Sequence, residues 1–339
     1  MSARSATARR GSVPAGVRTA VALAVVVPSA MIGVAWLVGQ VALDRWTWSQ
    51  WLFWFPACAV AGTSFAGALA AWRLLGPSLA RRAALGVLVV ASVLAAARSA
   101  RHDFGWAWSS GPSAGSIVVT HWNPQWPGDQ SLEAGRALAG VLGDVAVITG
   151  PGSMLRASVR GDWLPDGVQA RDFGAFGIVS RLAILDARIL ASASPAGIGS
   201  IWLAWFEVRA ATGERIRILA VDLPSQPRLA RGRVAAALAE LRATVRLPAS
   251  PDIVLGDLNA TPGSVVEGVL SAEHRSAPPW RASGWLCTYR RPWAFFRIDA
   301  MHAGPRLEWD SYRTVDLGIS EHRAQVGSFR VSSDGDRRE

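Results

Sequence analysis

The sequence predicts a three-helix membrane anchor followed by an α/β domain that contains two β-sheets. Three long stretches without a charged residue lie in the first hundred positions. From Ser116 onward, strand pairs are mixed with amphipathic helices, which excludes a purely parallel, doubly wound sheet. The segment Asp252–Pro262, DIVLGDLNATP, ends a short buried strand with an acid and an amide. These observations predict a membrane-attached domain with a polar cleft at a strand end.

The three charge-free stretches lie between Arg18 and Asp44, between Arg45 and Arg73, and between Arg82 and Arg98. At ~1.5 Å per residue the first two can cross a ~30 Å hydrocarbon core, whereas the third needs its flanking arginines to snorkel. A cleaved signal peptide would explain the first stretch but not three in succession. Tryptophans of the kind found in interfacial belts surround the first loop and the far end of the second stretch, at Trp36, Trp46, Trp48, Trp51, Trp54 and Trp72.

The distribution of arginines predicts the orientation in the membrane. Seven arginines precede the first stretch or lie between the second and third, against three on the opposite side. The positive-inside rule then places the N-terminus in the cytoplasm and everything after about residue 100 outside. We therefore expect a multi-pass protein of the cell membrane with an extracytoplasmic C-terminal domain.

The net charge of +10 belongs mostly to the predicted anchor. Residues 1–97 carry eight arginines and one acid, whereas residues 98–339 carry 27 arginines and 24 acids. This distribution argues against nucleic acid as a partner. The chain has no lysine, which excludes a P-loop lysine and Schiff-base chemistry. Its two cysteines, Cys58 and Cys287, are not expected to meet, so the domain must rely on its apolar core.

The predicted organisation has five parts. Residues 1–16 form a cytoplasmic tail, 17–99 the anchor, 100–115 a linker, 116–331 the α/β domain and 332–339 a polar tail. Helices are expected at Leu132–Leu142 and Arg228–Val245, and the arginines of the second are expected to form a solvated face or to contact anionic head groups. Strands are expected at Ile117–Thr120, Val145–Thr149, Gly177–Leu185, Ile201–Arg209, Arg215–Leu223, Ile253–Leu255, Phe295–Met301 and Val326–Val331.

Asp257 and Asn259 are the first candidates for chemistry. Both follow the strand Ile253–Leu255, and a strand end is rigid enough to aim two side chains into one cleft. The acid can take a proton from water, and the amide can donate hydrogen bonds to a phosphoryl oxygen. The simpler alternative is a turn, since both residue types favour turns.

The order of several motifs resembles the endonuclease/exonuclease/phosphatase superfamily, the DNase I-like fold. Asn123 follows the first strand, and GIVSRLAIL, LAVDLP, GDLNATP, RIDAM and SEHRAQV follow in that order. The resemblance covers roughly residues 116–331. It implies a four-layer αββα sandwich that cuts phosphoester bonds with a divalent cation, Mg²⁺ or Mn²⁺.

The resemblance also implies roles for individual residues. Asp257 would activate the attacking water, Asn259 would hold the phosphate, and Asn123 would assist at the metal and phosphate. His322 would stabilise charge on the phosphoryl group, with Asp299 orienting it. A phosphoryl transition state needs such hydrogen bonds and positive charge, and a carboxylate-bound histidine keeps a defined tautomer.

Three departures from the family pattern affect the metal site. The family's metal-binding Glu has no counterpart, because the second strand ends Ile148-Thr149-Gly150. Asp222 stands where many members have a histidine, and Glu321 replaces an aspartate before His322. Mg²⁺ favours carboxylate oxygens. We therefore expect Glu321 and Asp257 as metal ligands and Asp222 as an assisting group, or else as a cap for the loop Pro224–Pro227.

Two functions from different classes remain open at this stage. The first is a membrane-anchored, metal-dependent phosphoesterase that acts on lipid-linked or small phosphorylated molecules. The second is a catalytically degenerate pseudoenzyme that binds an envelope ligand or partner. The layout is similar to bacterial membrane proteins of the teicoplanin-resistance type, which favours a lipid-linked substrate. A secreted nuclease is a weaker third hypothesis, because the anchor holds the domain at a surface.

Overall fold

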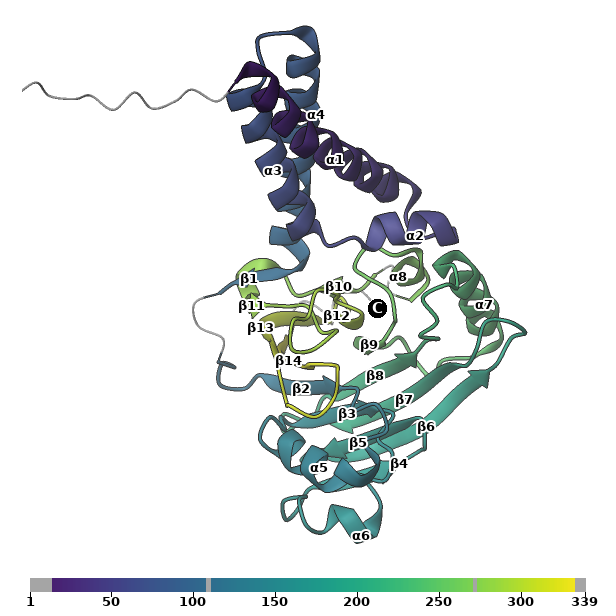
Figure 1. The fold of residues 1–339 in the computed structure, drawn as a ribbon. Helices are drawn as coiled ribbons and strands as arrows, with labels where there is room; N and C mark the ends of the chain where they lie inside the picture. The colour runs from purple at the N-terminus through teal and green to yellow at the C-terminus, as the bar shows by residue number, and fades with distance from the viewer. Residues whose placement is uncertain (1–13, 108–110, 271–272, 333–339) are drawn as a thin grey trace, which may run out of the picture. The chain divides into compact units, whose positions relative to one another are not determined.

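The computed structural model describes residues 14–107, 111–270 and 273–332 (Figure 1). Over these residues the chain divides into two compact units. One comprises residues 14–38 and 57–97, and the other comprises residues 39–56 and 98–332. The short segment between the first two apolar helices therefore belongs with the C-terminal domain.

Within the described residues, three helices are long and apolar enough to cross a membrane, as the sequence predicts. They are α1 (Ala15–Ala42), α3 (Ala57–Leu74) and α4 (Leu79–His102). The second charge-free stretch is interrupted, because Pro56 disfavours a helical conformation for the residue before it. Phe55 is extended, with ψ of 128°, and separates a short helix, α2 (Thr47–Trp54), from α3.

The helices of the first unit pack through small residues. A Cβ atom on Gly67 would lie 2.6 Å from Cβ of Ser29, and one on Gly33 would lie 3.0 Å from Cβ of Ala91. The Ser92 hydroxyl donates to the Ala61 carbonyl at 3.0 Å. Close backbone approach and interhelical hydrogen bonds of this kind are typical of helices that associate in lipid.

The described part of the second unit contains two sheets, which confirms the predicted two-sheet α/β class. The eight-stranded sheet has the order β1 (Phe104–Trp106), β11 (Ala282–Trp285), β13 (Leu307–Val315), β14 (Ala324–Val331), β2 (Ile117–Trp122), β3 (Val145–Thr149), β5 (Phe176–Ser180) and β4 (Gln169–Asp172). The six-stranded sheet has the order β10 (Arg275–Ser276), β12 (Asp299–Ala303), β9 (Ile253–Asp257), β8 (Arg215–Asp222), β7 (Ile201–Arg209) and β6 (Ala183–Ala193).

Three apolar clusters arrange these sheets and their helices in four layers. The largest cluster joins the two sheets and includes Val147, Phe206 and Ile218. A second lies between the six-stranded sheet and the helices α7 (Arg231–Thr244) and α8 (Val265–Leu270). A third lies between the eight-stranded sheet and the side of the domain that carries α5 (Ser131–Ala139) and α6 (Ala157–Arg160). Two single 3₁₀ turns complete the described elements, at Gly128–Gln130 and Pro279–Arg281.

The predicted strand Gly177–Leu185 is wrong as a single element. It consists of β5 and the start of β6, which belong to different sheets. The Ser180 hydroxyl accepts a hydrogen bond from the Leu182 backbone N–H at 3.0 Å and donates to the Leu182 carbonyl at 2.9 Å. This local turn lets the chain cross from one sheet to the other. The sequence does not indicate the turn, because the residues around it form an apolar run with high β-propensity.

Several other expectations differ from the structure. The last predicted helix begins at Arg231, and this arginine is buried instead of facing solvent. The predicted linker contributes β1, which pairs with β11, whereas its Trp108 lies outside the described residues. Phe295–Met301 begins too early, because β12 starts at Asp299. The pattern missed β4, β11 and β13.

The segment 43–56 is built into the C-terminal domain through the ends of two helices. The buried Gln50 amide donates to the Pro227 carbonyl at 2.7 Å and accepts from the Arg231 N–H, at the start of α7, at 3.0 Å. The buried Asp44 carboxylate accepts from the Val265 N–H, at the start of α8, at 3.1 Å. Helix N-termini need such acceptors, and Ala230 at the N-cap of α7 has no side chain to provide one. Figure 1 shows α2 beside α7 and α8.

We predict that Gln50→Ala destabilises the C-terminal domain by about 1–3 kcal/mol, because it leaves the buried Arg231 N–H without its partner and removes the hydrogen bond to the Pro227 carbonyl. Thermal unfolding of the detergent-solubilised full chain would measure the loss as a lower melting temperature. Gln169→Ala, at an exposed position on the edge strand β4, is the matched control and should melt like the wild type. Equal melting of both variants would contradict the capping role.

Candidate active site

Three aspartates stand in a row across neighbouring strands of the six-stranded sheet. Asp257 ends β9, and it is in register with Asp222 at the end of parallel β8 and with Asp299 at the start of antiparallel β12. Paired residues on adjacent strands point to the same face, about 4.5–5.5 Å apart between Cα atoms. The sheet therefore places three carboxyl groups side by side.

Strand alternation explains which face they occupy. On β9, Ile253 and Leu255 lie four and two residues before Asp257, and both belong to the apolar core between the sheets. Ile218 and Ala220 precede Asp222 in the same way, and Met301 and Ala303 follow Asp299. Because side chains repeat every second residue, the row forms a polar layer directly above the inter-sheet core.

The eight-stranded sheet completes this layer with uncharged polar groups. His121, Thr149 and Gln325 continue the inward faces of β2, β3 and β14. The His121 ring nitrogens lie 3.2 Å from Gln325 Oε1 and 3.1 Å from Thr149 Oγ1. Gln325 Nε2 also donates to the Asp299 carbonyl at 3.0 Å. His121 thus links three strands of the eight-stranded sheet, and Gln325 connects this sheet to β12 of the other.

Asp257 is at the centre of the hydrogen-bond network. Its Oδ2 accepts from Asn123 Nδ2 at 2.8 Å, and Asn123 directly follows β2 of the other sheet. Its Oδ1 accepts from the Asn259 backbone N–H at 2.9 Å, which forms a tight turn with Asn259 at φ of 47°. The Asn259 side chain donates to the Leu223 carbonyl at 2.8 Å. The turn that the sequence predicts as the simpler alternative for Asp257 and Asn259 is therefore the same structure that holds the Asp257 carboxylate in the site.

His322 is held between two of the aspartates. Its Nδ1 lies 2.8 Å from Asp299 Oδ2, and its Nε2 lies 3.8 Å from Asp257 Oδ2. The backbone around it is fixed by the Ser320 hydroxyl, which accepts from the His322 N–H, and by Trp122 Nε1, which donates to the His322 carbonyl. The Tyr289 ring packs on the imidazole at 4.9 Å between centroids.

These contacts separate the protonation states of Asp257 and His322. Burial and the neighbouring Asp299 charge raise the pKa of Asp257 to about 6, despite the opposing effect of His322. Burial of the imidazole opposes its charge, but Asp299 and Asp257 outweigh burial and raise the pKa of His322 to about 9. Between these values Asp257 is ionised and His322 is protonated, which suits a base beside a cationic hydrogen-bond donor.

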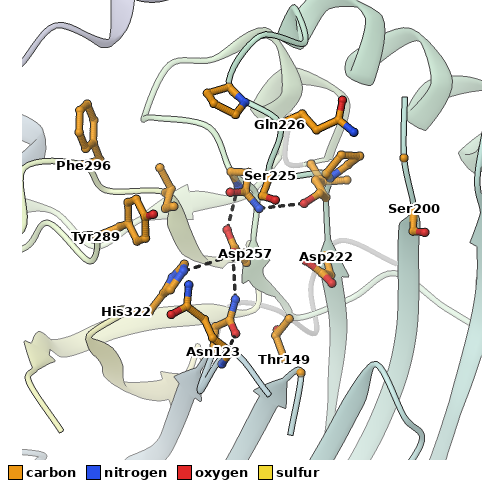
Figure 2. Close-up of a pocket in the computed structure, with 18 of the residues that line it drawn as sticks. Asn123, Thr149, Ser200, Asp222, Ser225, Gln226, Asp257, Tyr289, Phe296 and His322 are labelled. Atoms are coloured by element: carbon orange, nitrogen blue, oxygen red, sulfur yellow. Dashed lines mark hydrogen bonds and ion pairs between the residues drawn. The ribbon is translucent and has the colours of Figure 1, made fainter. Parts of the chain in front are cut away.

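Asp222 differs from Asp257 and Asp299 in its hydrogen bonding. Among the described residues, no hydrogen bond or ion pair reaches its carboxylate (Figure 2). Burial, followed by the charges of Asp257 and Asp299, raises its pKa well above the usual value. A partly buried carboxyl group beside two other carboxyl groups favours the binding of either a proton or a cation.

Asp257, Asp299 and His322 could hold a metal ion, because their ligand atoms lie within 4.8 Å of one another. His322 is already bonded to Asp299, and an imidazolium has no lone pair left for a metal. The carboxyl groups of Asp222 and Asp257, which are in register on neighbouring strands, offer hard oxygen donors. This donor set fits a divalent cation of the Mg²⁺ or Mn²⁺ type.

Asp222 and Asp257 of this row form the floor of a cavity of about 710 Å³. Figure 2 shows Asp257 central, with Asn123 and His322 directed toward it and Asp222 beside it. The walls are more apolar than the floor, and they include Trp51, Trp54, Trp126, Tyr289, Phe296 and Ile298.

The structure brings together most of the side chains that the sequence singled out. Asp257, Asn259, Asn123, His322 and Asp222 all line the cavity. Asp299 lies beneath His322.

Glu321 lies apart from this cluster. Its carboxylate pairs with Arg290 at 2.7 Å and accepts from the Tyr289 hydroxyl. The structure therefore gives no support to Glu321 as a metal ligand.

Sequence reasoning missed two groups of site residues. The sequence indicates Trp51 and Trp54 only as part of an interfacial belt, and no sequence signal connects them with a strand end about 200 residues later. Thr149 was noted only for the absence of a carboxylate, although it continues the period-2 face of Val145 and Val147. That alternation could have placed its side chain in the polar layer.

Comparisons with known proteins found similarity, at low sequence identity, to solved structures. No family model matches the sequence, and no curated protein matches it. The chain is similar to a solved endonuclease/exonuclease/phosphatase structure from Beutenbergia cavernae, with 16% identity and a TM-score of 0.47 over 64% of this chain and 72% of that one. It is also similar to truncated Caenorhabditis elegans TDP2 (16%, 0.45, 63% and 97%) and to ANGEL2, a 2′,3′-cyclic phosphatase (10%, 0.45, 64% and 96%).

We predict that Asp299→Asn moves both limbs of any pH–activity profile to lower pH. Removing this charge lowers the pKa of His322, which must stay protonated, and the pKa of Asp257, which must stay ionised. The wild-type profile should rise near pH 6 and fall near pH 9. Rates measured from pH 4 to 10 test this expectation, with Asp186→Asn, at a surface ion pair, as the control. An unchanged alkaline limb would show that Asp299 does not set the charge of His322.

Proposed function

We propose that this chain is a membrane-anchored, metal-dependent phosphoesterase whose C-terminal domain acts outside the cytoplasm on a phosphorylated lipid. The observation that carries the proposal is the row of three aspartates, two of which lie at the floor of the cavity, with His322 and Asn123 in contact with its central member. The order of motifs that resembles the endonuclease/exonuclease/phosphatase superfamily supports the same class of reaction.

Asp257 is the proposed base. Both of its oxygens are fixed by N–H donors from Asn123 and Asn259, so a remaining lone pair can receive a proton from a water above it. The water oxygen then bonds to phosphorus as the phosphoester P–O bond breaks. The leaving oxygen keeps the electron pair and takes a proton from solvent.

His322 is the proposed cationic donor. Because Nδ1 is occupied by Asp299, the Nε2–H faces Asp257 and the cavity, where it can donate to a phosphoryl oxygen. The Asp299 contact also fixes the orientation of the ring, so that the charge is in place before the transition state forms.

Asp222 and Asp257 are the residues proposed to hold the cation. A bound Mg²⁺ or Mn²⁺ would polarise the phosphate and neutralise its developing charge. This assignment gives Asp222 a partner and replaces Glu321, the ligand expected from the sequence. β3 ends in the uncharged Thr149, where the family's metal-binding Glu would stand. A cation held by Asp222 and Asp257 does not need that Glu.

Two features support a lipid substrate at the outer surface. The three apolar helices fit anchoring in a membrane, and the arginine distribution predicts that the domain lies outside. The cavity also combines a charged floor with aromatic walls, which suits a phosphate attached to an apolar group. The resemblance in layout to teicoplanin-resistance-type proteins remains a prediction.

A pseudoenzyme that binds an envelope ligand is the second candidate. The observation that favours it is the absence of two family groups from the site, since Thr149 and Asp222 occupy their positions. In that case Asp222 would be protonated and would donate a hydrogen bond to the ligand instead of binding a metal.

We predict that purified protein with Mg²⁺ or Mn²⁺ hydrolyses a generic phosphodiester or a pyrophosphate, and that Asp257→Ala abolishes the reaction. In calorimetric titrations, Asp222→Asn should weaken Mn²⁺ binding about tenfold or more, because it removes a charged ligand. Glu321→Gln is the matched control and should bind Mn²⁺ as the wild type does. Hydrolysis at the same background rate in wild type and Asp257→Ala would leave the pseudoenzyme as the better description.

We also predict that reporters fused after Val331 are active only outside the cytoplasm. Reporters fused between α3 and α4, near Gly76, should be active only inside, because three crossings place these points on opposite sides. A pair of fusions at each point, one to alkaline phosphatase and one to a fluorescent protein that matures in the cytoplasm, would measure the orientation. The opposite pattern would exclude an extracytoplasmic site.

A further inference from the structure

One wall of the cavity comes from a part of the chain that is remote in sequence from its floor. Trp51 and Trp54 of α2 line the cavity together with Asp222 and Asp257, although α2 lies in the short segment that connects the first two apolar helices. The domain that begins after α4 therefore does not contain the whole cavity.

The position of this wall is fixed by a chain of contacts. Trp54 Nε1 donates to Asp44 Oδ2 at 3.3 Å, and its ring lies under the Arg231 guanidinium, with the guanidinium carbon 5.7 Å from the ring centroid. Arg231 in turn donates to the Pro224 and Gln226 carbonyls, each at 2.8 Å. This loop directly follows Asp222 and lines the cavity. Helix α2 is thereby linked to the backbone beside the proposed metal ligand.

Trp51 has a different role from Trp54. No hydrogen bond to its indole nitrogen is found among the described residues, its surface is 50% exposed, and its ring meets Trp54 edge-on at 6.2 Å between centroids. It therefore presents an apolar face to the cavity without supporting the fold as Trp54 does. A phosphate bound over Asp257 would direct any attached apolar group toward such a face.

The position of α2 in the chain indicates the chemical nature of the apolar group attached to the phosphate. Four residues separate α2 from α1 and two separate it from α3. Insertion of both apolar helices in a membrane would keep α2 within about 15 Å of the membrane surface, because an extended chain reaches ~3.5 Å per residue. Trp46, at the N-cap of α2, and Trp48, in its first turn, are half exposed and stack at 5.9 Å between ring centroids, in keeping with tryptophans at a membrane interface.

We propose that Trp51 is a specificity-determining residue that binds the hydrocarbon portion of a phosphorylated lipid next to its phosphate. This inference rests on the proposed function and adds to it the residue that selects the lipid. A nucleotide base could also stack on an indole. The connection of α2 to two apolar helices and the nearly balanced charge of residues 98–339 favour a lipid.

The test compares substrates that share a headgroup and differ in chain length. Isopentenyl and farnesyl diphosphate form one pair, and glycerol 3-phosphate and dioctanoyl phosphatidic acid form the other. For full-length Trp51→Ala, we expect kcat/KM on the long-chain member to fall about tenfold and kcat/KM on the short-chain member to stay within about twofold, because only the apolar contact is lost. Trp51→Phe should restore most of the long-chain activity.

Trp48→Ala is the matched control, since Trp48 lies on α2 outside the cavity lining, and it should leave the ratio unchanged. Equal losses on both chain lengths, or a larger loss on a dinucleotide than on the lipids, would overturn the proposal. Affinities of the same four compounds for Asp257→Ala, measured by calorimetry, provide a readout that does not need turnover. If Asp257→Ala binds the long-chain compounds more tightly than the short-chain ones, and the double variant Asp257→Ala/Trp51→Ala does not, the role of Trp51 holds even without hydrolysis. If the protein hydrolyses these compounds and Trp51→Ala leaves the chain-length preference unchanged, the role of Trp51 is refuted and the proposed phosphoesterase function is not.

Discussion

The repulsion among three neighbouring carboxyl groups is the constraint on which the site depends. Asp222, Asp257 and Asp299 end or begin adjacent strands in register, so the sheet itself sets their spacing. Water cannot screen them well, because the row is the upper layer of the inter-sheet core. Compensation has to come from the opposite sheet and from the loop before β14. Asn123 supplies an amide donor to Asp257, and His322 supplies a positive charge between Asp257 and Asp299.

These groups do not balance the negative charge of all three carboxyl groups, and the charge that remains determines which ligands the cavity can bind. His322 balances one negative charge, and the two N–H groups that reach Asp257 stabilise it without adding charge. Asp222 receives neither, so its carboxyl group takes a proton or a cation. An oxygen-rich position beside an ionised base is what a divalent cation and a phosphate together would occupy. The pseudoenzyme and the phosphoesterase differ only in which of these Asp222 takes.

The segment between α1 and α3 links this chemistry to the predicted membrane anchor. Asp44 and Gln50 supply acceptors to the first turns of α8 and α7, and Trp54 packs on the arginine that holds the loop after Asp222. Buried polar groups of this kind are costly to leave unpaired, so the segment is an integral part of the domain and not only a connection. A domain cut free at residue 100 would lose two helix caps and one wall of its cavity.

Local patterns in the sequence are sufficient to predict several features of this protein. Charge-free length predicts the apolar helices, and alternation predicts most central strands. A strand end followed by a turn identifies Asp257 and Asn259, and motif order adds Asn123, His322 and Asp299. Features that depend on strand register and on distant contacts become visible only in the folded chain. The pairing of β8, β9 and β12 put Asp222 beside Asp257, whereas Glu321 was drawn to Arg290. The burial of Arg231 and the position of Trp51 could not be predicted either. No local sequence pattern indicates which distant segment covers the end of a helix.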